Sequence, residues 1–278
     1  ATAARNAVLS PAGARMAGSF RVIFSFAYCN YLAVQYCNFT KFCQNIIPYA
    51  LRQKNRGHQF PMKIKIFPRL AKGDLIGVAA PCARFDQSLL NQGIDSLKQL
   101  GFAVRVPKKI YEKKRYLAGE DLCRAEVINQ LVADPDVKGI ICARGGFGAM
   151  RMLAHLDWDL IRTHPKLFVG FSDATALLTS VMQQAGLGVV HGPNLVSLAA
   201  PDAPTLDSFF AAVTGTLTAV TADDGICLKP GQAKGVLAGG NLATLVHLVG
   251  TRFAPDFSGT VLFLEDVGEP AYKIDRML

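Results

Sequence analysis

The sequence predicts an α/β fold in which helices cover both faces of a parallel sheet. From Asp74 onward, short apolar runs alternate with longer segments whose apolar residues recur at helical spacing. The apolar runs end at turns that contain glycine or proline, and 50% of the 278 residues are hydrophobic, enough for a sizeable core. Strands that alternate with helices in this way form parallel sheets that are buried on both faces.

The elements follow one another in a regular order. "LIGVAAP" predicts a first strand that ends at Pro81, and "SLLNQGIDSLKQLG" predicts a helix that stops at Gly101. "FAVRVP" is the next predicted strand, and "EDLCRAEVINQLVAD" the next helix. "VKGIICARGGFGAMRMLAHLDWDLIRT" then gives a buried strand, a glycine-rich turn and a helix, and "KLFVGFSDATALLTSVMQQAG" repeats that plan.

Changes in composition divide the chain into four parts. Residues 62–200 form the N-terminal α/β domain, and residues 201–234, rich in proline, threonine and glycine, are predicted to be a linker. Strand and helix patterns resume in residues 235–278, which we expect to be the start of a C-terminal domain truncated in mid-helix at Leu278.

Residues 1–61 are predicted to be a leader or an upstream extension, with a natural start at Met62. Seven of the nine net positive charges lie in residues 1–62, which contain no acid, and the body is nearly neutral. This distribution argues against nucleic acid as a partner. Polar residues interrupt the aromatic-rich stretch 20–39, so no membrane association is expected. A targeting leader and a real accessory segment remain alternatives.

The seven cysteines, at positions 29, 37, 43, 82, 123, 142 and 227, form no CxxC pair and no regular spacing. This pattern argues against a metal site and against a disulfide framework. It favours a reducing compartment, and we expect a cytoplasmic protein. Cys142 lies in an apolar run and is predicted to be a core residue.

Ser172 directly follows the strand "KLFVG" and opens the next helix, with Asp173 in its first turn. A serine at a sharp strand-to-helix turn exposes its hydroxyl beside free helix N–H groups, which suits a nucleophile that forms an oxyanion. The competing interpretation is an ordinary helix cap. The elbow pattern G-x-S-x-G is incomplete, because Ala174 occupies its last position.

The stretch "ARGGFG" follows another strand. Gly145 and Gly146 allow close backbone approach and supply N–H donors for a carboxylate, a phosphate or an oxyanion. The spacing matches no nucleotide-binding motif. Arg144 is a candidate partner for a substrate carboxylate, or else forms a surface or interdomain ion pair.

Acidic residues and one histidine complete the candidates. "LFLEDVGEP" places Glu265 and Glu269 at a strand end, where a carboxylate orients a histidine or simply begins a surface loop. His191, in "GLGVVHGPN", lies at a strand end on the same predicted edge of the sheet. We favour a structural or site-lining role for it.

Several segments in combination resemble the LD-carboxypeptidase family of serine peptidases, which includes muramoyltetrapeptide carboxypeptidase and the microcin self-immunity peptidases. They are "GDLIGVAAP", "VKGIICARGGFGAMRML", "KLFVGFSDATALL", "HGPNLVSL", "LAGGNLATLVHLVGT" and "LFLEDVGEPAYKIDRML". The resemblance spans residues 63–278 in order.

The resemblance implies the roles of the site residues. Ser172 would be the nucleophile and Glu265 the acid that orients a histidine, with Glu269 as the fallback. The oxyanion hole would use the N–H groups of Asp173 and of Gly146 or Gly145. His191 would line the site, while the family's catalytic histidine comes after the "IDRML" helix, so the chain as written is expected to be inactive.

The resemblance also implies an activity and an architecture. The activity is release of a C-terminal D-amino acid, D-alanine from a murein tetrapeptide in peptidoglycan recycling, without metal or cofactor. The fold is a flavodoxin-like N-terminal domain and a smaller α/β domain, with the site in the crevice between them and a homodimer when full length. Two alternatives remain: a peptidase that cleaves a peptidyl-nucleotide antibiotic, and a non-catalytic small-ligand binder on the same scaffold.

Overall fold

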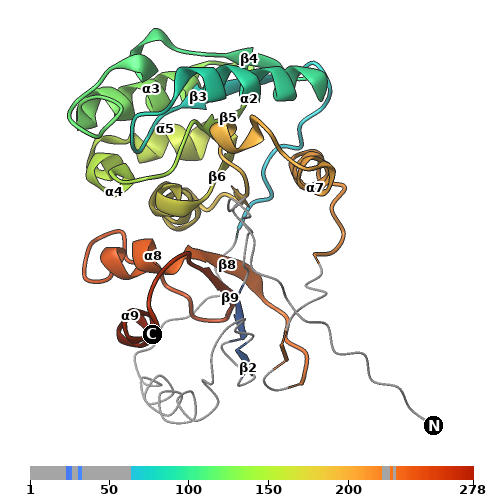
Figure 1. Ribbon diagram of the computed structural model, residues 1–278, viewed down its shortest axis with the longest axis vertical. Helices are drawn as coiled ribbons and strands as arrows, with labels where there is room; N and C mark the ends of the chain where they lie inside the picture. The colour runs from blue at the N-terminus through green and yellow to red at the C-terminus, as the bar shows by residue number, and fades with distance from the viewer. Residues whose placement is uncertain (1–22, 27–30, 33–63, 221–225, 228–229) are drawn as a thin grey trace, which may run out of the picture.

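The computed structural model describes residues 23–26, 31–32, 64–220, 226–227 and 230–278. These residues form two units, each built around its own sheet, which lie one above the other along the longest axis (Figure 1). The first unit contains the five strands β3 (Leu75–Ala79), β4 (Ala103–Arg105), β5 (Val137–Cys142), β6 (Leu167–Gly170) and β7 (Val190–His191).

The first sheet is entirely parallel, as the sequence predicts. Its strand order is β4-β3-β5-β6-β7, and every neighbouring pair runs in the same direction. Numbered along the chain, this is the order 2-1-3-4-5 of flavodoxin-like folds. The predicted fold class is confirmed. In such sheets ligands bind outside the carboxyl ends of the strands, and β5, β6 and β7 all end close to candidate residues.

Helices and short helical turns connect these strands. The longer helices are α2 (Gln87–Gln99), α3 (Asp121–Ala133) and α7 (Ala203–Thr214). The shorter ones are α4 (Ala149–Met152), α5 (Trp158–Thr163), α6 (Thr175–Ser180) and the single turns η1 (Lys108–Tyr111), η2 (Leu153–His155), η3 (Ser172–Ala174), η4 (Val181–Ala185) and η5 (Leu195–Leu198).

The core of the first unit lies between this sheet and its helices. Helix α3 packs on β3 and β5, while α6 packs on β6 and β7. The buried strand residues include Val78, Ile140, Ile141 and Phe168, all without exposed surface. Burial of such side chains contributes about 1.5–3 kcal/mol each, so this cluster supplies most of the unit's stability. Cys142 is 1% exposed, as predicted for a core residue.

Helix α7 lies inside the segment 201–234, where composition alone predicts a linker. Asp202 caps its first turn by accepting from the Thr205 N–H, and Pro204 occupies a first-turn position. Proline is tolerated there because its missing N–H has no partner within the helix. Phe209 and Val213 are buried against the first unit, so this helix belongs to that unit.

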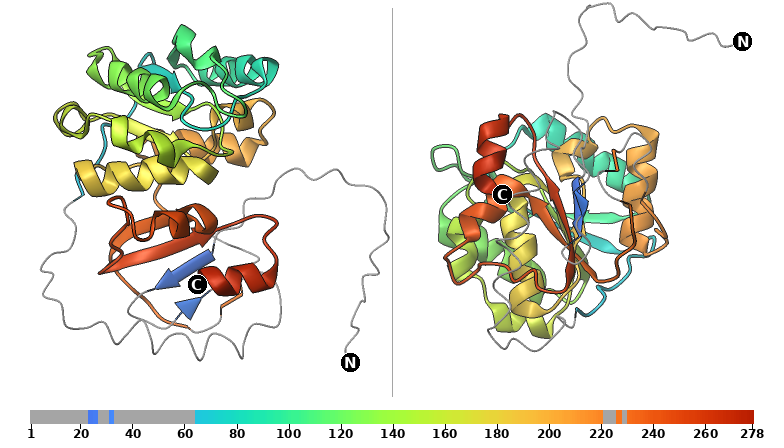
Figure 2. Two further views of the ribbon diagram at one scale, coloured as in Figure 1. Left: turned by 90° about the vertical axis from the view of Figure 1, so that its left-hand side faces the viewer. Right: turned by 90° about the horizontal axis from the view of Figure 1, so that it is seen from below.

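The second unit contains β8 (Val236–Asn241), α8 (Leu242–Leu248), β9 (Thr260–Glu265) and α9 (Ala271–Met277). Strands β8 and β9 pair in parallel, and Leu242 and Leu245 of α8 form a small core with Leu264 of β9. Figure 2 shows that α6 faces this unit, consistent with the contacts of α6 with β8 and α8.

Two short strands of the predicted leader join the second sheet. β1 (Ile23–Phe26) pairs antiparallel with β9, and β2 (Tyr31–Leu32) pairs with β1. The rest of residues 1–61, including Cys29, Cys37 and Cys43, lies outside the described residues. Among the helices that the structure does describe, none has the length and apolar character needed to cross a membrane.

Candidate active site

Ser172 lies at the sharp turn that joins β6 to η3. Its φ angle is +61°, in the left-handed region that residues other than glycine rarely adopt. The residues that cap η3 and α6 are Phe171 and Ala174, and neither caps with its side chain. The turn is therefore not an ordinary serine cap. A strained backbone at a half-buried serine that follows a strand is a feature typical of active sites.

The glycine-rich loop after β5 lies directly against this serine. A Cβ atom added to Gly145 would lie 2.9 Å from both Cβ and Oγ of Ser172. No side chain fits between the loop and the serine hydroxyl, so glycine is required at this position. Gly146 has a φ of +112°, and a Cβ there would lie 2.6 Å from the Ala83 side chain.

The Asp173 side chain connects the serine turn to the same loop. Asp173 is 8% exposed, and its Oδ2 accepts a hydrogen bond from the Ala149 N–H at 2.9 Å. Burial, followed by the negative charge of Asp173, raises the pKa of Cys142 to about 12. The same two causes raise the pKa of Cys82 well above its usual value. Both thiols stay protonated at neutral pH, which leaves Ser172 as the better candidate nucleophile.

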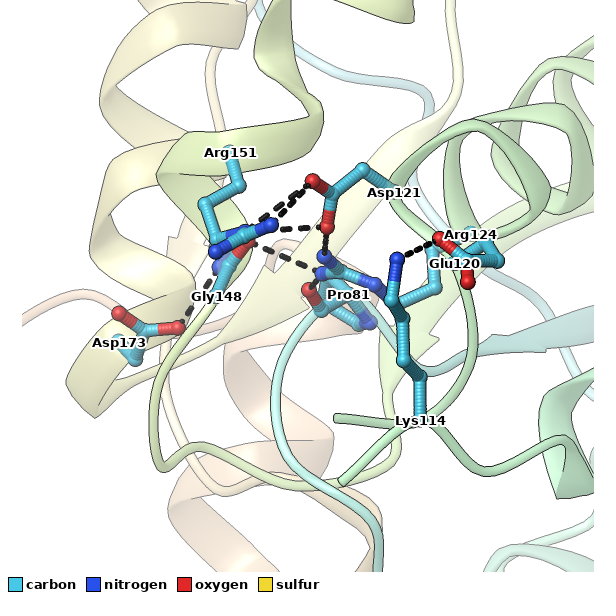
Figure 3. Close-up of polar contacts among 9 residues, drawn as sticks. Pro81, Lys114, Glu120, Asp121, Arg124, Gly148, Arg151 and Asp173 are labelled. Atoms are coloured by element: carbon cyan, nitrogen blue, oxygen red, sulfur yellow. Dashed lines mark hydrogen bonds and ion pairs between the residues drawn. The ribbon is translucent and has the colours of Figure 1, made fainter. Parts of the chain in front are cut away.

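A buried arginine holds the far end of the glycine-rich loop (Figure 3). The Arg124 guanidinium donates to the carbonyl oxygens of Pro81 and Gly148, the second at 3.0 Å, and pairs with Asp121. Asp121 also accepts from Arg151, at 2.9–3.2 Å. The Arg124 side chain is only 1% exposed, so its charge depends on these partners.

Glu265 and His191 meet where the two units approach each other. Glu265 is 7% exposed at the end of β9, and its Oε1 lies 3.6 Å from His191 Nε2. This is an ionic contact when the imidazole is protonated, and it is too long for a hydrogen bond. The His191 ring also packs edge-on against Phe263, with ring centroids 5.0 Å apart. Glu269 instead faces Lys273 on α9, at 3.4 Å.

A hydrogen bond also connects the second unit to the helix that follows Ser172. The Asn241 N–H donates to Thr175 Oγ1 at 3.1 Å, and Thr175 is fully buried. Gly240 makes this approach possible, because a Cβ there would lie 2.5 Å from Thr175 Cγ2. Gly240 also has a φ of +145°, which favours glycine.

The structure thus brings Ser172, Asp173 and Gly145 together, and it brings Glu265 next to His191. Arg144 is exposed and donates to the Arg84 carbonyl at 2.9 Å, so its described partner is a backbone group and not a carboxylate. Sequence reasoning missed several supporting residues: Arg124, Asp121, Thr175 and Asn194. One signal was available, since Arg124 stands on the apolar face of its helix, four residues before Ile128.

The fold and the strained serine turn define a two-unit α/β protein with a hydrolase-type strand-to-helix turn, and comparison with known proteins identifies the family. Residues 76–192 match the LD-carboxypeptidase N-terminal domain, and residues 234–278 match the LD-carboxypeptidase C-terminal domain. The chain belongs to the LD-carboxypeptidase family. The resemblance deduced from the motifs is therefore confirmed.

Individual relatives agree with this family. A probable murein peptide carboxypeptidase of Bacillus subtilis is 39% identical over 214 residues, which cover 75% of this chain and 67% of the relative. The microcin C7 self-immunity protein MccF of Escherichia coli is 30% identical, over 75% of this chain and 71% of that protein. The crystal structure of muramoyltetrapeptide carboxypeptidase from Oxalobacter formigenes superimposes with a TM-score of 0.64 at 33% identity, over 73% of this chain and 69% of that one. These relatives support a carboxypeptidase role.

Proposed function

We propose that this protein is a serine-type LD-carboxypeptidase that hydrolyses the L,D-peptide bond of a murein tetrapeptide and releases D-alanine. The observation that carries the proposal is the left-handed turn at Ser172, with its hydroxyl against Gly145. Strain at a serine that follows a parallel strand is the local geometry of a nucleophile at a strand-to-helix turn.

In this proposal, Ser172 Oγ attacks the carbonyl carbon of the scissile bond. The N–H groups of Asp173 and of Gly146 or Gly145 stabilise the oxyanion, because they flank the serine and are fixed before the reaction begins. Formation of the acyl-enzyme expels D-alanine, and water then releases the shortened peptide. Arg144 is kept as a candidate partner for the substrate's terminal carboxylate.

Glu265 is the better candidate for the acid that orients the histidine. It is buried and faces an imidazole, whereas Glu269 pairs with Lys273 on α9, the helix that begins two residues after it. The family resemblance puts the catalytic base in a segment that comes after the helix 271–277, and His191 contacts Glu265 within the described residues. We assign His191 to the wall of the site and not to proton transfer.

Murein peptide is favoured over a peptidyl-nucleotide substrate. The relative named for murein peptide is 39% identical, and the relative named for self-immunity is 30% identical. The proposal includes a cytoplasmic homodimer that acts in peptidoglycan recycling. The alternative of a non-catalytic binder predicts that tetrapeptide binds without release of D-alanine.

The test is made in a full-length version of the protein, which is the parent of every variant, and it measures D-alanine release from an L,D-tetrapeptide together with labelling by a fluorophosphonate probe. Ser172→Ala is expected to keep less than about a hundredth of the activity and to lose labelling, because the covalent route is removed. Ser180→Ala is the matched control, since that hydroxyl is buried on α6 without a hydrogen-bond partner among the described residues. Equal rates of D-alanine release for the parent and Ser172→Ala would show that Ser172 is not the nucleophile.

The same assay tests whether Glu265 or Glu269 is the acid that orients the histidine. Glu265→Gln should lower kcat by about 10³-fold or more, as removal of a triad carboxylate's charge does. Glu269→Gln should have a much smaller effect, because its partner is the exposed Lys273. The reverse order of effects would show that Glu269 is the acid. Loss of activity in His191→Ala with substrate affinity unchanged would show that His191 is the base.

A further inference from the structure

Asn194 lies beneath the turn that carries Ser172. It is 1% exposed, and its carboxamide faces the backbone of Phe171, the residue before the serine. Asn194 Oδ1 accepts from the Phe171 N–H at 3.3 Å, and Asn194 Nδ2 donates to the Phe171 carbonyl at 3.3 Å. Both hydrogen-bonding groups of one side chain therefore go to one residue of the backbone.

This pair of hydrogen bonds continues the sheet where its last strand stops. Strands β6 and β7 pair as far as Gly170 and His191, and the Gly192 N–H donates to the Gly170 carbonyl at 3.0 Å. Pro193 follows and has no N–H to extend the ladder. A carboxamide carries the same donor and acceptor as a peptide group, so Asn194 takes the place of the next strand residue.

The next residue along the chain is the strained one. Ser172 has a φ of +61°, and a non-glycine residue keeps such a conformation only when its surroundings hold it. Fixing both the N–H and the carbonyl of Phe171 limits the ways in which the following residue can relax. Asn194 also packs closely on both flanks, since a Cβ at Gly170 would lie 3.1 Å from its Oδ1 and one at Gly145 would lie 3.5 Å from its Nδ2.

We propose that Asn194 is a positioning residue that holds Ser172 in its left-handed conformation and sets the hydroxyl against the Gly145 loop. The expected effect on kcat rests on the proposed function, whereas the expected effect on the conformation of Ser172 rests on geometry alone. Asn194 contacts backbone and no reacting atom, so it acts on the orientation of the nucleophile. Its loss should lower kcat and leave KM nearly unchanged.

The kinetic test uses Asn194→Asp, which has nearly the same shape. An ionised carboxylate keeps the acceptor for the Phe171 N–H but removes the side-chain donor to the Phe171 carbonyl, which then keeps the hydrogen bond from the Ala174 N–H. We expect kcat to fall by about 10-fold to 10²-fold at neutral pH with KM within about threefold. Protonation restores an O–H donor, so the ratio of variant to parent activity should rise as the pH falls. Because burial raises the pKa of a carboxyl group, the rise should begin above the ordinary aspartate value of about 3.9.

Asn129→Asp is the matched control. Asn129 also uses its carboxamide on two backbone groups, donating to the His155 carbonyl at 3.3 Å and accepting from the Asp157 N–H at 3.1 Å. These groups lie before α5 and not at the serine turn. The control should show no pH-dependent recovery of kcat, which separates positioning of Ser172 from a general loss of stability.

Hydrogen exchange of the Phe171 amide tests the geometry without any activity. The amide should be protected in the parent and should exchange faster in Asn194→Leu, while amides at the centre of β5 stay protected. If the parent releases no D-alanine, this measurement still decides the structural claim and only the proposed function fails. Unchanged protection in Asn194→Leu, a kcat equal to the parent's in Asn194→Asp, or a rise in KM alone would overturn the proposal.

Discussion

Replacing Gly145 by alanine tests whether the contact between the glycine-rich loop and Ser172 matters for function. The added Cβ would lie 2.9 Å from Ser172 Cβ and Oγ. Unstrained carbon contacts are about 3.5–4.0 Å, so the loop or the serine must move by roughly 0.5–1 Å. The backbone of Gly145 does not have a positive φ, so the perturbation is steric and not conformational.

The size of the effect follows from that displacement. Misplacement of a reacting group by about 1 Å costs about 10²-fold in rate, and overpacking a buried site costs about 1–3 kcal/mol of stability. Gly145→Ala should therefore lower kcat/KM for D-alanine release by about 10²-fold while the protein stays folded. Coupling the released D-alanine to a D-amino acid oxidase gives the rate, and urea unfolding gives the stability.

Gly139→Ala is the matched control, on the strand β5 that leads into the glycine-rich loop. A Cβ there would lie 3.4 Å from the nearest Leu70 atom and 3.6 Å from Leu167 Cβ, which are ordinary contacts. Its activity should stay within about threefold of the parent, since packing changes of this size cost little. If Gly145→Ala retains activity equal to that of Gly139→Ala, the loop does not define the position of the hydroxyl, and the reasoning from close contact is refuted.

Two further predictions concern the support around the site. The hydrogen bonds from Arg151, and then those from Arg124, hold the pKa of Asp121 below its usual value. Because the folded pKa is depressed, its contribution to stability is complete above the unfolded value of about 3.9 and is lost as the pH falls through the folded value. Urea unfolding should show that Asp121→Asn is less stable than the parent at pH 6 and that the difference shrinks below about pH 4; a difference that stays constant with pH contradicts this. Thr175→Val removes the acceptor for the Asn241 N–H and should cost about 1–3 kcal/mol, whereas Thr175→Ser keeps the hydroxyl and should cost less. Equal stabilities of the two Thr175 variants would mean that this hydrogen bond does not hold the units together.

The sequence predicted the architecture of the first unit well, because its signals are local. Apolar runs such as 137–142 become buried strands, and the glycine-containing turns follow them. Helix α7 was missed because Pro204 and the surrounding threonines indicate a loop by composition. Spacing carried the better signal, since Leu206, Phe209 and Val213 recur at helical intervals and the last two are buried.

The candidate site was predictable only in part, and sequence separation is the reason. Ser172 and Gly145 each stand at a strand end, and parallel strands bring such ends to one edge. The side chains that support them make contacts between distant positions: Asn194 bonds a residue 23 positions away, and Arg124 bonds Pro81 across 43 positions. No periodicity encodes such side-chain-to-backbone contacts. Their only sequence signal is a polar residue at a position where the pattern predicts an apolar one.

The supports around Ser172 explain why a strained serine can persist at the edge of an otherwise regular sheet. The Gly145 loop contacts it from the end of β5, Asn194 fixes the preceding residue from beyond β7, and Asn241 of the second unit bonds Thr175 on the helix that follows. A left-handed conformation costs about 1–2 kcal/mol for a residue with a side chain, which is comparable to one or two hydrogen bonds. No one of these contacts outweighs that cost by a wide margin. The conformation of Ser172 therefore depends on several separate segments being folded and in contact at the same time, including the unit that does not carry the serine.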